Sequence, residues 1–423
     1  MKKLVIILTL ISLSTYTWAQ DLNITLGRSN LEQYKNYRRA IQYFDASLQD
    51  EKTRDSPDAW YWRGKAYLQW ALDSTAGSKP EDVVPEAARS FVKAVDLKPD
   101  YGSEINTPMH TSAILSYNKG VVNFQNKLYA PAYENFMRVV TIYNAGGGNR
   151  FVSNAVFTSI IPDAKMYAAY AAENDNRLSD AQLLFEELIK IQTKKNADIY
   201  QALIELYQKQ NKTAEMFALI KDARKQFPAN KTFRDLELNY YINTGKQAEL
   251  LPLLEAAVKQ DPDNPELLYN LANVYMNLVF PIDANGNLLP APANFKDLYL
   301  KTENAYKRAV KLKPDNADYN YNAGVLYYSN ASVFNHQMTN ITGTSPAENK
   351  KVNDLAALRN AEFNKALPYF EKAYTILDNR SGSLSDTEKA TYRNTLTGLK
   401  EIYSRLNKTA KADEVKKKLD ELR

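Results

Sequence analysis

The sequence predicts an all-α fold in which about nine helix pairs stack as a solenoid. The first observation is a recurring block of a small, a large apolar and another small residue at offsets of four and three, which places them on one helical face. The second is a regular spacing, since Pro228 and Pro262 lie 34 residues apart and follow Ala223 and Ala257 by five positions. The third is composition: 423 residues, 44% hydrophobic and 24% charged, provide enough apolar side chains for a core.

Two kinds of helix alternate along the chain. One carries the block just described, and the helix before it has an aromatic or large residue, a small residue four positions on and Tyr three further. Small residues let two helices approach closely, and the ring fills the space beside them. Blocks of the first kind are Ala40, Phe44, Ser47; Ala87, Phe91, Ala94; Ala132, Phe136, Val139; Ala181, Phe185, Leu188; and Ala366, Phe370, Ala373. Those of the second kind are Trp60, Gly64, Tyr67; Leu268, Ala272, Tyr275; and Asn320, Gly324, Tyr327.

This pattern resembles the tetratricopeptide repeat (TPR), a pair of antiparallel helices closed by a proline. The resemblance implies a right-handed superhelix. Proline suits the closing position because it cannot continue a helix. Three stop signals of this kind are Lys98-Pro99-Asp100, Asp261-Pro262-Asp263-Asn264 and Lys313-Pro314-Asp315-Asn316. A calcium site at Asp261, Asp263, Asn264 and Glu266 is disfavoured because the glycine of an EF-hand loop is missing.

The repeat register covers nearly the whole chain after residue 24. It predicts units at 24–56, 57–102, 113–146, 162–195, 197–230, 231–264, 265–316, 317–380 and 392–423. We therefore divide the chain into N-terminal units at 24–146, a glycine-containing joint at 147–161 and C-terminal units at 162–423. The run Ala145-Gly-Gly-Gly-Asn-Arg150 is interpreted as a flexible connection, because it lacks the Gly-Lys-Ser/Thr ending of a phosphate loop.

Residues 1–19 have the features of a secretory signal peptide. Two lysines precede an apolar run from Leu4 to Leu13, and Thr17 and Ala19 suit a cleavage site after Ala19. An uncleaved anchor is the alternative, although the run is shorter than a membrane span. The chain has no cysteine, which excludes disulfides and a lipoprotein anchor. We expect export across an inner membrane and a periplasmic location in a bacterium.

Four insertions interrupt the register, and the two largest fall in units seven and eight. The earlier two are the loop near 73–80 and the glycine run described above. Near 279–296, Asn285-Gly286 between apolar residues predicts a small β-hairpin at 279–290. A metal site formed by Asp283, Asn285 and Asn287 is the alternative there. The polar segment within 329–358 is expected to be a loop that covers one end of a groove, contacts a partner or is merely tolerated.

Few residues in the sequence suggest catalysis. Only His110 and His336 are present and there is no cysteine, which excludes a histidine-rich metal site and a cysteine nucleophile. A paired-carboxylate mechanism remains open, but nothing distinguishes any pair among the 49 acidic residues. The net charge of +5 is small and the basic residues are dispersed, so nucleic acid is not a favoured partner. We expect no enzyme activity, no cofactor and no metal.

The resemblance implies a binding groove lined by residues five and nine of each unit, on the first helix. The candidates are Tyr61, Lys65, Tyr117, Val121, Gln201, Glu205, Asp235, Asn239, Tyr269, Asn273, Tyr321 and Val325. Such a surface suits an extended peptide backbone. Half or more of these residues are equally explained by packing. A chaperone-type carboxylate clamp is excluded, because Tyr269 and Asp318 stand where that variant of the family has lysines.

Three functions are compatible with this sequence. The favoured one is a periplasmic scaffold or adaptor that binds a protein segment, in envelope assembly or secretion. A glycan-binding protein of the nutrient-uptake type is the second, and a hydrolase built on the insertions is the third. The partner, the pathway and the oligomeric state do not follow from the sequence.

Overall fold

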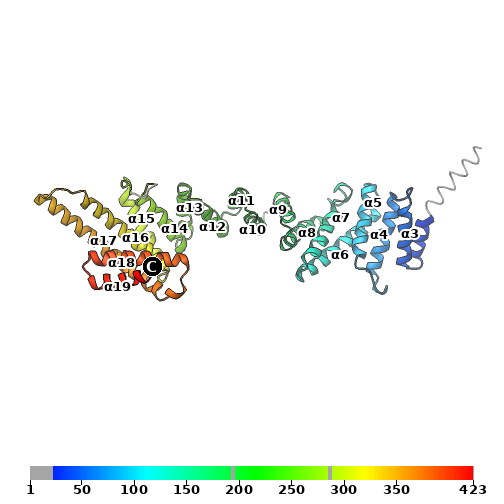
Figure 1. Ribbon diagram of the computed structural model, residues 1–423. Helices are drawn as coiled ribbons and strands as arrows, with labels where there is room; N and C mark the ends of the chain where they lie inside the picture. The colour runs from blue at the N-terminus through cyan, green and yellow to red at the C-terminus, as the bar shows by residue number, and fades with distance from the viewer. Residues whose placement is uncertain (1–21, 192–195, 284–287, 423) are drawn as a thin grey trace, which may run out of the picture. The chain divides into compact units, whose positions relative to one another are not determined.

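The computed structural model describes residues 22–191, 196–283 and 288–422, which form eighteen α-helices in nine successive pairs (Figure 1). The pairs are α2 (Leu22–Glu32) with α3 (Tyr37–Gln49), α4 (Pro57–Leu72) with α5 (Val83–Leu97), α6 (Asn106–Gln125) with α7 (Tyr129–Asn144), α8 (Ala155–Asn174) with α9 (Leu178–Ile191), α10 (Ala197–Lys209) with α11 (Thr213–Gln226), α12 (Lys231–Asn243) with α13 (Gln247–Gln260), α14 (Pro265–Val279) with α15 (Phe295–Leu312), α16 (Ala317–Thr339) with α17 (Pro346–Asp378), and α18 (Asp386–Arg405) with α19 (Thr409–Glu421). Each pair falls within or close to one of the nine predicted units.

The chain forms two compact units that meet within α12, the first ending at Phe233 and the second beginning at Arg234. In the first unit, each helix from α2 to α11 packs against the next, and the same holds from α13 to α19 in the second. The predicted joint at 147–161 contains the first residues of α8, which begins at Ala155. No helix in the described part of the chain is both long enough and apolar enough to cross a membrane.

Glycine beneath a phenylalanine ring is the recurring packing contact of the fold. A Cβ atom added at Gly27 would lie 2.5 Å from the ring of Phe44, and one at Gly64 would lie 2.7 Å from that of Phe91. Equivalent contacts join Gly120 to Phe136, and join both Gly324 and Gly398 to Phe370. The predicted close approach of paired helices is therefore confirmed at these positions, where no side chain larger than hydrogen fits without a shift.

Substituting Gly64 with alanine should destabilise the first unit, although alanine is the better helix former. The added methyl group overlaps Phe91, and overpacking of this kind costs about 1–3 kcal/mol. Chemical denaturation followed by circular dichroism measures the change. Gly382→Ala is the control, because nothing lies within 4 Å of a Cβ at that position. A Gly64→Ala protein as stable as the control would contradict the packing argument.

Tyrosine hydroxyls connect successive helix pairs. Tyr207 on α10 donates to Glu186 on α9 at 2.9 Å, and Tyr403 on α18 donates to Glu371 on α17 at 2.6 Å. Tyr275 and Glu255 make the same contact between α14 and α13. Burial and the bonded carboxylate raise the pKa of each of these tyrosines. These three tyrosines thus serve contacts between repeats.

The predicted β-hairpin at 279–290 is wrong. Among the described residues, this segment forms no strand, only one isolated antiparallel bridge between Ile282 and Leu288. Pro281 and Pro290 flank the bridge, and proline has no N–H to extend a ladder. Asn285 and Gly286, on which the prediction rested, lie outside the described residues, as does Asn287 of the alternative metal site.

The insertion of unit eight is mainly helical. Residues 329–339 continue α16 and residues 346–358 belong to α17, so only the short segment 340–345 is a connection. Ser345 begins α17 with a capping box, in which its hydroxyl accepts from the backbone N–H of Glu348 and the Glu348 carboxylate accepts from the backbone N–H of Ser345. The segment expected to be a loop is therefore a helical extension. The capping-box residues Ser345 and Glu348, which indicate the start of a helix, could be read from the sequence.

Candidate functional site

A polar cavity between α12 and α14 contains two of the predicted groove residues. It has a volume of about 260 Å³ and is lined by Asp235, Leu238, Asn239, Asn264, Glu266, Leu267 and Asn270. Three amides and two carboxylates are thus presented beside two leucine side chains. Amides both donate and accept hydrogen bonds, so this lining can pair with the N–H and C=O groups of a peptide.

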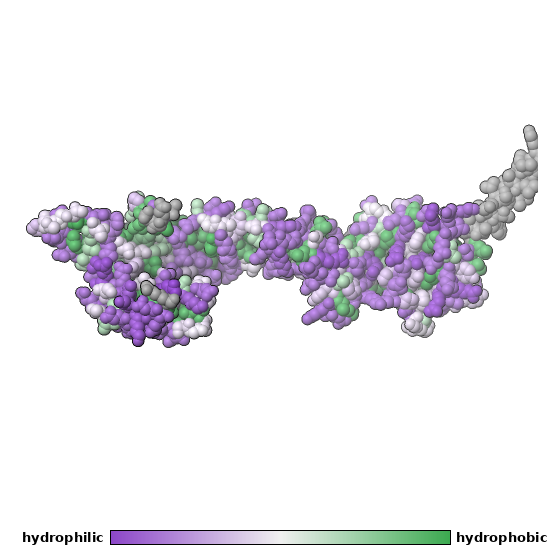
Figure 2. All heavy atoms as spheres, in the orientation of Figure 1, coloured by the Kyte–Doolittle hydropathy of each residue, from purple (hydrophilic) through white to green (hydrophobic). Residues whose placement is uncertain are grey.

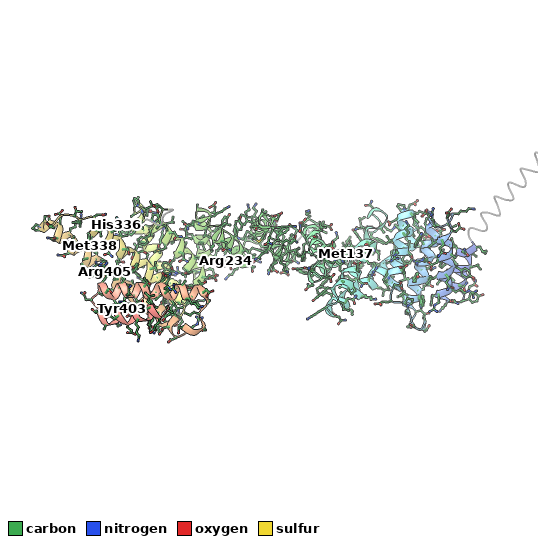
Figure 3. All side chains as sticks on the ribbon, in the orientation of Figure 1. Met137, Arg234, His336, Met338, Tyr403 and Arg405 are labelled. Carbon is green, nitrogen blue, oxygen red and sulfur yellow. The ribbon has the colours of Figure 1, made fainter. Side chains whose placement is uncertain are left out.

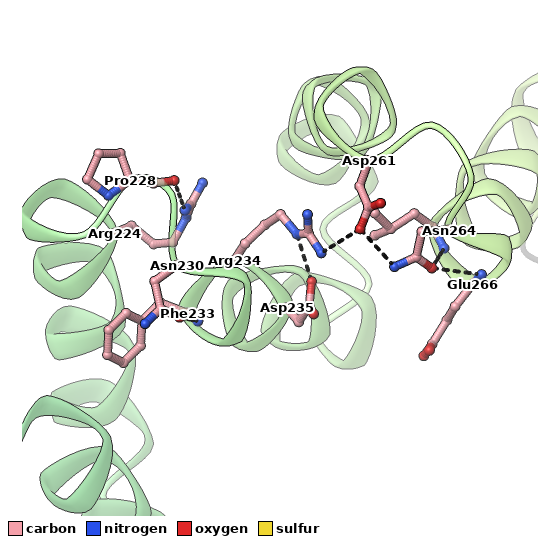
Figure 4. Close-up of polar contacts among 10 residues, drawn as sticks. Arg224, Pro228, Asn230, Phe233, Arg234, Asp235, Asp261, Asn264 and Glu266 are labelled. Atoms are coloured by element: carbon pink, nitrogen blue, oxygen red, sulfur yellow. Dashed lines mark hydrogen bonds and ion pairs between the residues drawn. The ribbon is translucent and has the colours of Figure 1, made fainter. Parts of the chain in front are cut away.

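One side of this cavity is formed at the start of α14, directly after the helix-stop signal that ends with Asn264. The side chain of Asn264 caps that helix, because its Oδ1 accepts from the backbone N–H groups of Glu266 at 3.1 Å and Leu267 at 3.2 Å (Figure 4). Glu266 then stands in the first turn, where the helix dipole favours a negative charge. The sequence analysis placed Asn264 in a helix-stop signal and considered Glu266 only for the disfavoured calcium site, so it missed their position at the cavity.

The buried side chain of Arg234 forms an ion pair with the carboxylate of Asp235. Its Nε lies 2.8 Å from Asp235 Oδ1, and its terminal nitrogen lies 3.9 Å from Asp261 Oδ2 (Figures 3 and 4). Only 5% of Arg234 is exposed, and within the described part of the chain one terminal nitrogen has no hydrogen-bond partner. Two carboxylates near one buried guanidinium balance its charge and orient Asp235.

Tyr269 and Asn273, two further groove candidates, take part in an internal network. The hydroxyl of Tyr269 accepts from Asn322 Nδ2 at 2.6 Å, and its ring stacks on Tyr319 with centroids 4.5 Å apart. Asn273 Oδ1 accepts from Tyr306 at 2.7 Å. Burial raises the pKa of Tyr269, while its hydrogen bonds to Asn273 and Asn322 lower it in part. These residues stabilise the contact between the seventh and eighth pairs.

Tyr321 on α16 also serves packing. Its half-buried ring meets Phe370 edge to face at 5.7 Å, and burial raises the pKa of its hydroxyl. Val325, one turn further along the same helix, packs against the core around Phe370. The candidate groove residues on α14 and α16 therefore make contacts inside the protein.

In the first unit, Tyr61 and Lys65 belong to a cationic and aromatic cluster on α4. Tyr61 is buried, and its ring lies 5.4 Å from that of Tyr101. Lys65 Nζ lies 4.1 Å from the centre of the Trp62 ring and 3.5 Å from Glu32. The contact with Trp62 is a cation–π interaction, which holds the lysine against the aromatic surface.

The remaining candidates of the first unit lie apart from this cluster. Tyr117 is half-buried, and its ring meets that of Phe136 edge to face with the centroids 5.6 Å apart. Val121 packs against the hydrophobic core that contains Phe136. Gln201 and Glu205 are exposed on α10, where the amide of Gln201 donates to the Glu205 carboxylate at 2.9 Å. Only this last pair is open to solvent.

The insertions of the seventh and eighth pairs meet around one cavity of about 630 Å³. Phe280 lines it from the connection between α14 and α15, and Phe295 from the start of α15. Val333 and His336 line it from the extended part of α16, where Figure 3 labels His336. Figure 2 shows hydrophobic surface over this connection, where Leu288 is among the exposed apolar residues. Sequence reasoning identified both insertions but did not predict that they come together.

The described residues offer no cluster of three or more His, Asp or Glu side chains able to hold a metal ion. Asp283 lies next to the residues that are outside the described part of the chain. Asn264, named in the disfavoured calcium reading, uses its side-chain oxygen as the cap of α14.

Comparisons with known proteins gave one family match and several similar structures. A family model for the tetratricopeptide repeat matches residues 25–69. The C-terminal part of a TPR repeat-containing protein from Cytophaga hutchinsonii is similar in structure, with 14% identity, coverage of 72% of this chain and 95% of that one, and a TM-score of 0.43. A TPR protein from Bacteroides fragilis has 18% identity, covers 67% and 97%, and has a TM-score of 0.28. One from Parabacteroides merdae has 13% identity, covers 62% and 93%, and has a TM-score of 0.33.

No curated protein sequence matches this chain significantly. The family match at residues 25–69 coincides with α2, α3 and α4, where Gly27 lies beneath Phe44. The same glycine–phenylalanine contact recurs in later pairs, including that of Gly324 with Phe370. Residues 25–69 thus match the tetratricopeptide-repeat family model, and later helix pairs repeat the glycine–phenylalanine contact found there.

Proposed function

We propose that this protein is a non-catalytic scaffold that holds an extended segment of a partner protein in the cavity between α12 and α14. The observation that carries the proposal is the presentation of Asn239 and Asn270 with two carboxylates around one cavity. Backbone amide and carbonyl groups of an extended chain find partners in such a lining. Because tetratricopeptide repeats typically bind proteins, the family supports the same role.

The charges of the cavity favour a partner segment that carries lysine or arginine. Glu266 is exposed and, within the described part of the chain, makes no ion pair. The carboxylate of Asp235 is half-buried and already oriented by Arg234. A cationic side chain of the partner would lie near Glu266, while its backbone pairs with the asparagine amides.

We further propose that the protein acts in the periplasm, within an assembly or secretion complex of the envelope. The support is the signal-like sequence of residues 1–19 and the lack of cysteine in the chain. Fractionation of cells together with N-terminal sequencing tests this location. A mature chain that begins at Gln20 is expected, and an intact Met1 in the cytoplasmic fraction would contradict it.

Substituting both Asn239 and Asn270 with alanine should reduce partner capture about fivefold or more, since each hydrogen bond lost contributes about 0.5–1.5 kcal/mol. The measurement is quantitative co-purification of the native, full-length chain from envelope extracts, followed by binding of the recovered partner in purified form. Both asparagines lie at the surface, Asn239 exposed and Asn270 half-buried, so the fold should persist.

Asn353→Ala is the matched control, because Asn353 is exposed on α17 in the same unit, away from the cavity. Tyr269 and Asn273 are unsuitable for this test, since their substitution would disrupt the internal network. Equal capture by the double variant and by Asn353→Ala would reject the α12–α14 cavity as the binding site. A segment captured through it that contains no lysine or arginine would reject the proposed charge preference.

A further inference from the structure

A second cavity lies between α5 and α7, the second helices of two successive pairs. Its volume is about 350 Å³, near the lower end of the range found for small-molecule sites. Its apolar wall is formed by Ala88 and Val92 of α5 and by Met137 of α7, and Met137 is labelled in Figure 3. This cavity belongs to the first unit and is separate from the polar cavity on the first helices of the second unit.

Three cationic side chains surround this apolar wall: Arg89, Lys93 and Arg138. Arg89 is satisfied within the protein, because it lies 2.9 Å from the Glu86 carboxylate. Arg138 donates only to a neutral group, the Oδ1 of Asn135, at 2.7 Å. Within the described ranges, neither Arg138 nor Lys93 forms an ion pair with a carboxylate.

Of the two acidic residues of the lining, Glu134 forms an ion pair outside the cavity and Asp96 accepts a backbone hydrogen bond. Asp96 accepts a hydrogen bond from the backbone N–H of Gly146 at 3.0 Å. Glu134 lies 3.3 Å from Arg177 of the next helix pair. Burial, together with the charge of Arg89, lowers the pKa of Arg138, although Glu134 raises it in part. Among the described residues, the half-buried guanidinium of Arg138 thus forms no ion pair, and the carboxylate of Glu134 offsets its charge only in part.

We propose that this cavity binds a small amphiphilic anion, in which a carboxylate or phosphate group meets Arg138 and Lys93 and an apolar chain lies against Val92 and Met137. Arginine is well suited to both oxyanions, because its guanidinium presents several donors in one plane. The volume suits a ligand with a short hydrocarbon chain. The inference is independent of the peptide-binding role proposed above.

Isothermal titration calorimetry of the full chain with octanoate and octyl phosphate tests the proposal. We expect one molecule to bind per chain, more weakly at high salt because screening reduces the attraction. Octanol, which lacks the charge, and acetate or inorganic phosphate, which lack the apolar chain, should bind at least about tenfold more weakly. Preference for octanoate over octyl phosphate, or the reverse, distinguishes the two headgroups.

Arg138→Gln should weaken binding roughly tenfold or more, as expected for the loss of a hydrogen bond to a charged group. Lys93→Gln is a second variant, and because Lys93 is exposed its substitution leaves the fold intact. Arg39→Gln is the matched control, since Arg39 is exposed on α3 and does not line the cavity. Undetectable binding of both amphiphiles, equal binding by all four proteins, or equally tight binding of octanol would overturn the proposal.

Discussion

Substituting Arg63 with methionine is expected to lower the free energy of unfolding of the first unit by about 3–5 kcal/mol, the usual cost of removing one partner from a buried ion pair. Arg63 of α4 lies 2.7 Å from Asp45 of α3 and 2.8 Å from Glu86 of α5. It also donates to Ser90 at 2.7 Å. Glu86 is only 7% exposed, so without Arg63 its carboxylate would remain buried with a single, largely exposed partner, Arg89.

Chemical denaturation followed by circular dichroism measures this loss, and two further variants make it specific. Lys65→Met, two residues along the same helix, removes a partly exposed contact with Glu32 at 3.5 Å and a cation–π contact with Trp62 at 4.1 Å, and should lower stability by no more than about 2 kcal/mol. Adding Glu86→Gln to Arg63→Met should restore part of the loss, because a neutral amide is less costly to bury. If Arg63→Met is no less stable than Lys65→Met, the network does not stabilise the unit.

Substituting Phe370 with alanine should destabilise the second unit by about 3–5 kcal/mol. The ring is 2% exposed, and it lies against both Gly324 of α16 and Gly398 of α18. Its removal leaves a cavity that neither glycine can fill. Because each repeat depends on its neighbours for stability, the effect should extend to the last helix pair.

Hydrogen exchange of the backbone amides in α16, α17 and α18 locates this effect, and urea denaturation gives its size. Leu358→Ala is the control on the same helix, since Leu358 is 50% exposed and its substitution should cost no more than about 0.5 kcal/mol. Uniform loss of protection across the chain in both variants would show that Phe370 has no special role between these pairs.

The helix pairs could be predicted from the sequence because their packing follows a local rule. The small residue at Gly64 and the ring at Phe91 belong to neighbouring helices of one pair, and a fixed spacing places them together. The hairpin prediction failed because it weighed Asn285-Gly286 above Pro281 and Pro290, which limit pairing to one bridge. The helical extension of α16 and α17 was missed because the polar composition of the segment within 329–358 was taken to indicate a loop, and the helix cap at Ser345 was not considered.

The binding role of the candidate groove stays a prediction. Asp235 and Asn239 line the cavity between α12 and α14, whereas Tyr269 and Asn273 bond within the protein. A position on the first helix specifies which face a residue occupies. It does not specify whether a neighbouring Asn322 or Tyr306 already satisfies the side chain.

The sequence by itself determined the repeated helix pairs, their approximate limits and the glycine–aromatic contacts, because these depend on spacings within one or two helices. Only the tertiary structure decided where the insertions of the seventh and eighth pairs meet, which tyrosines are satisfied internally and that Arg138 lacks an anionic partner among the described residues. The physical reason is that hydrogen bonding and charge compensation depend on side chains from different helix pairs. Their distances follow from how the helices stack, and local periodicity does not encode them.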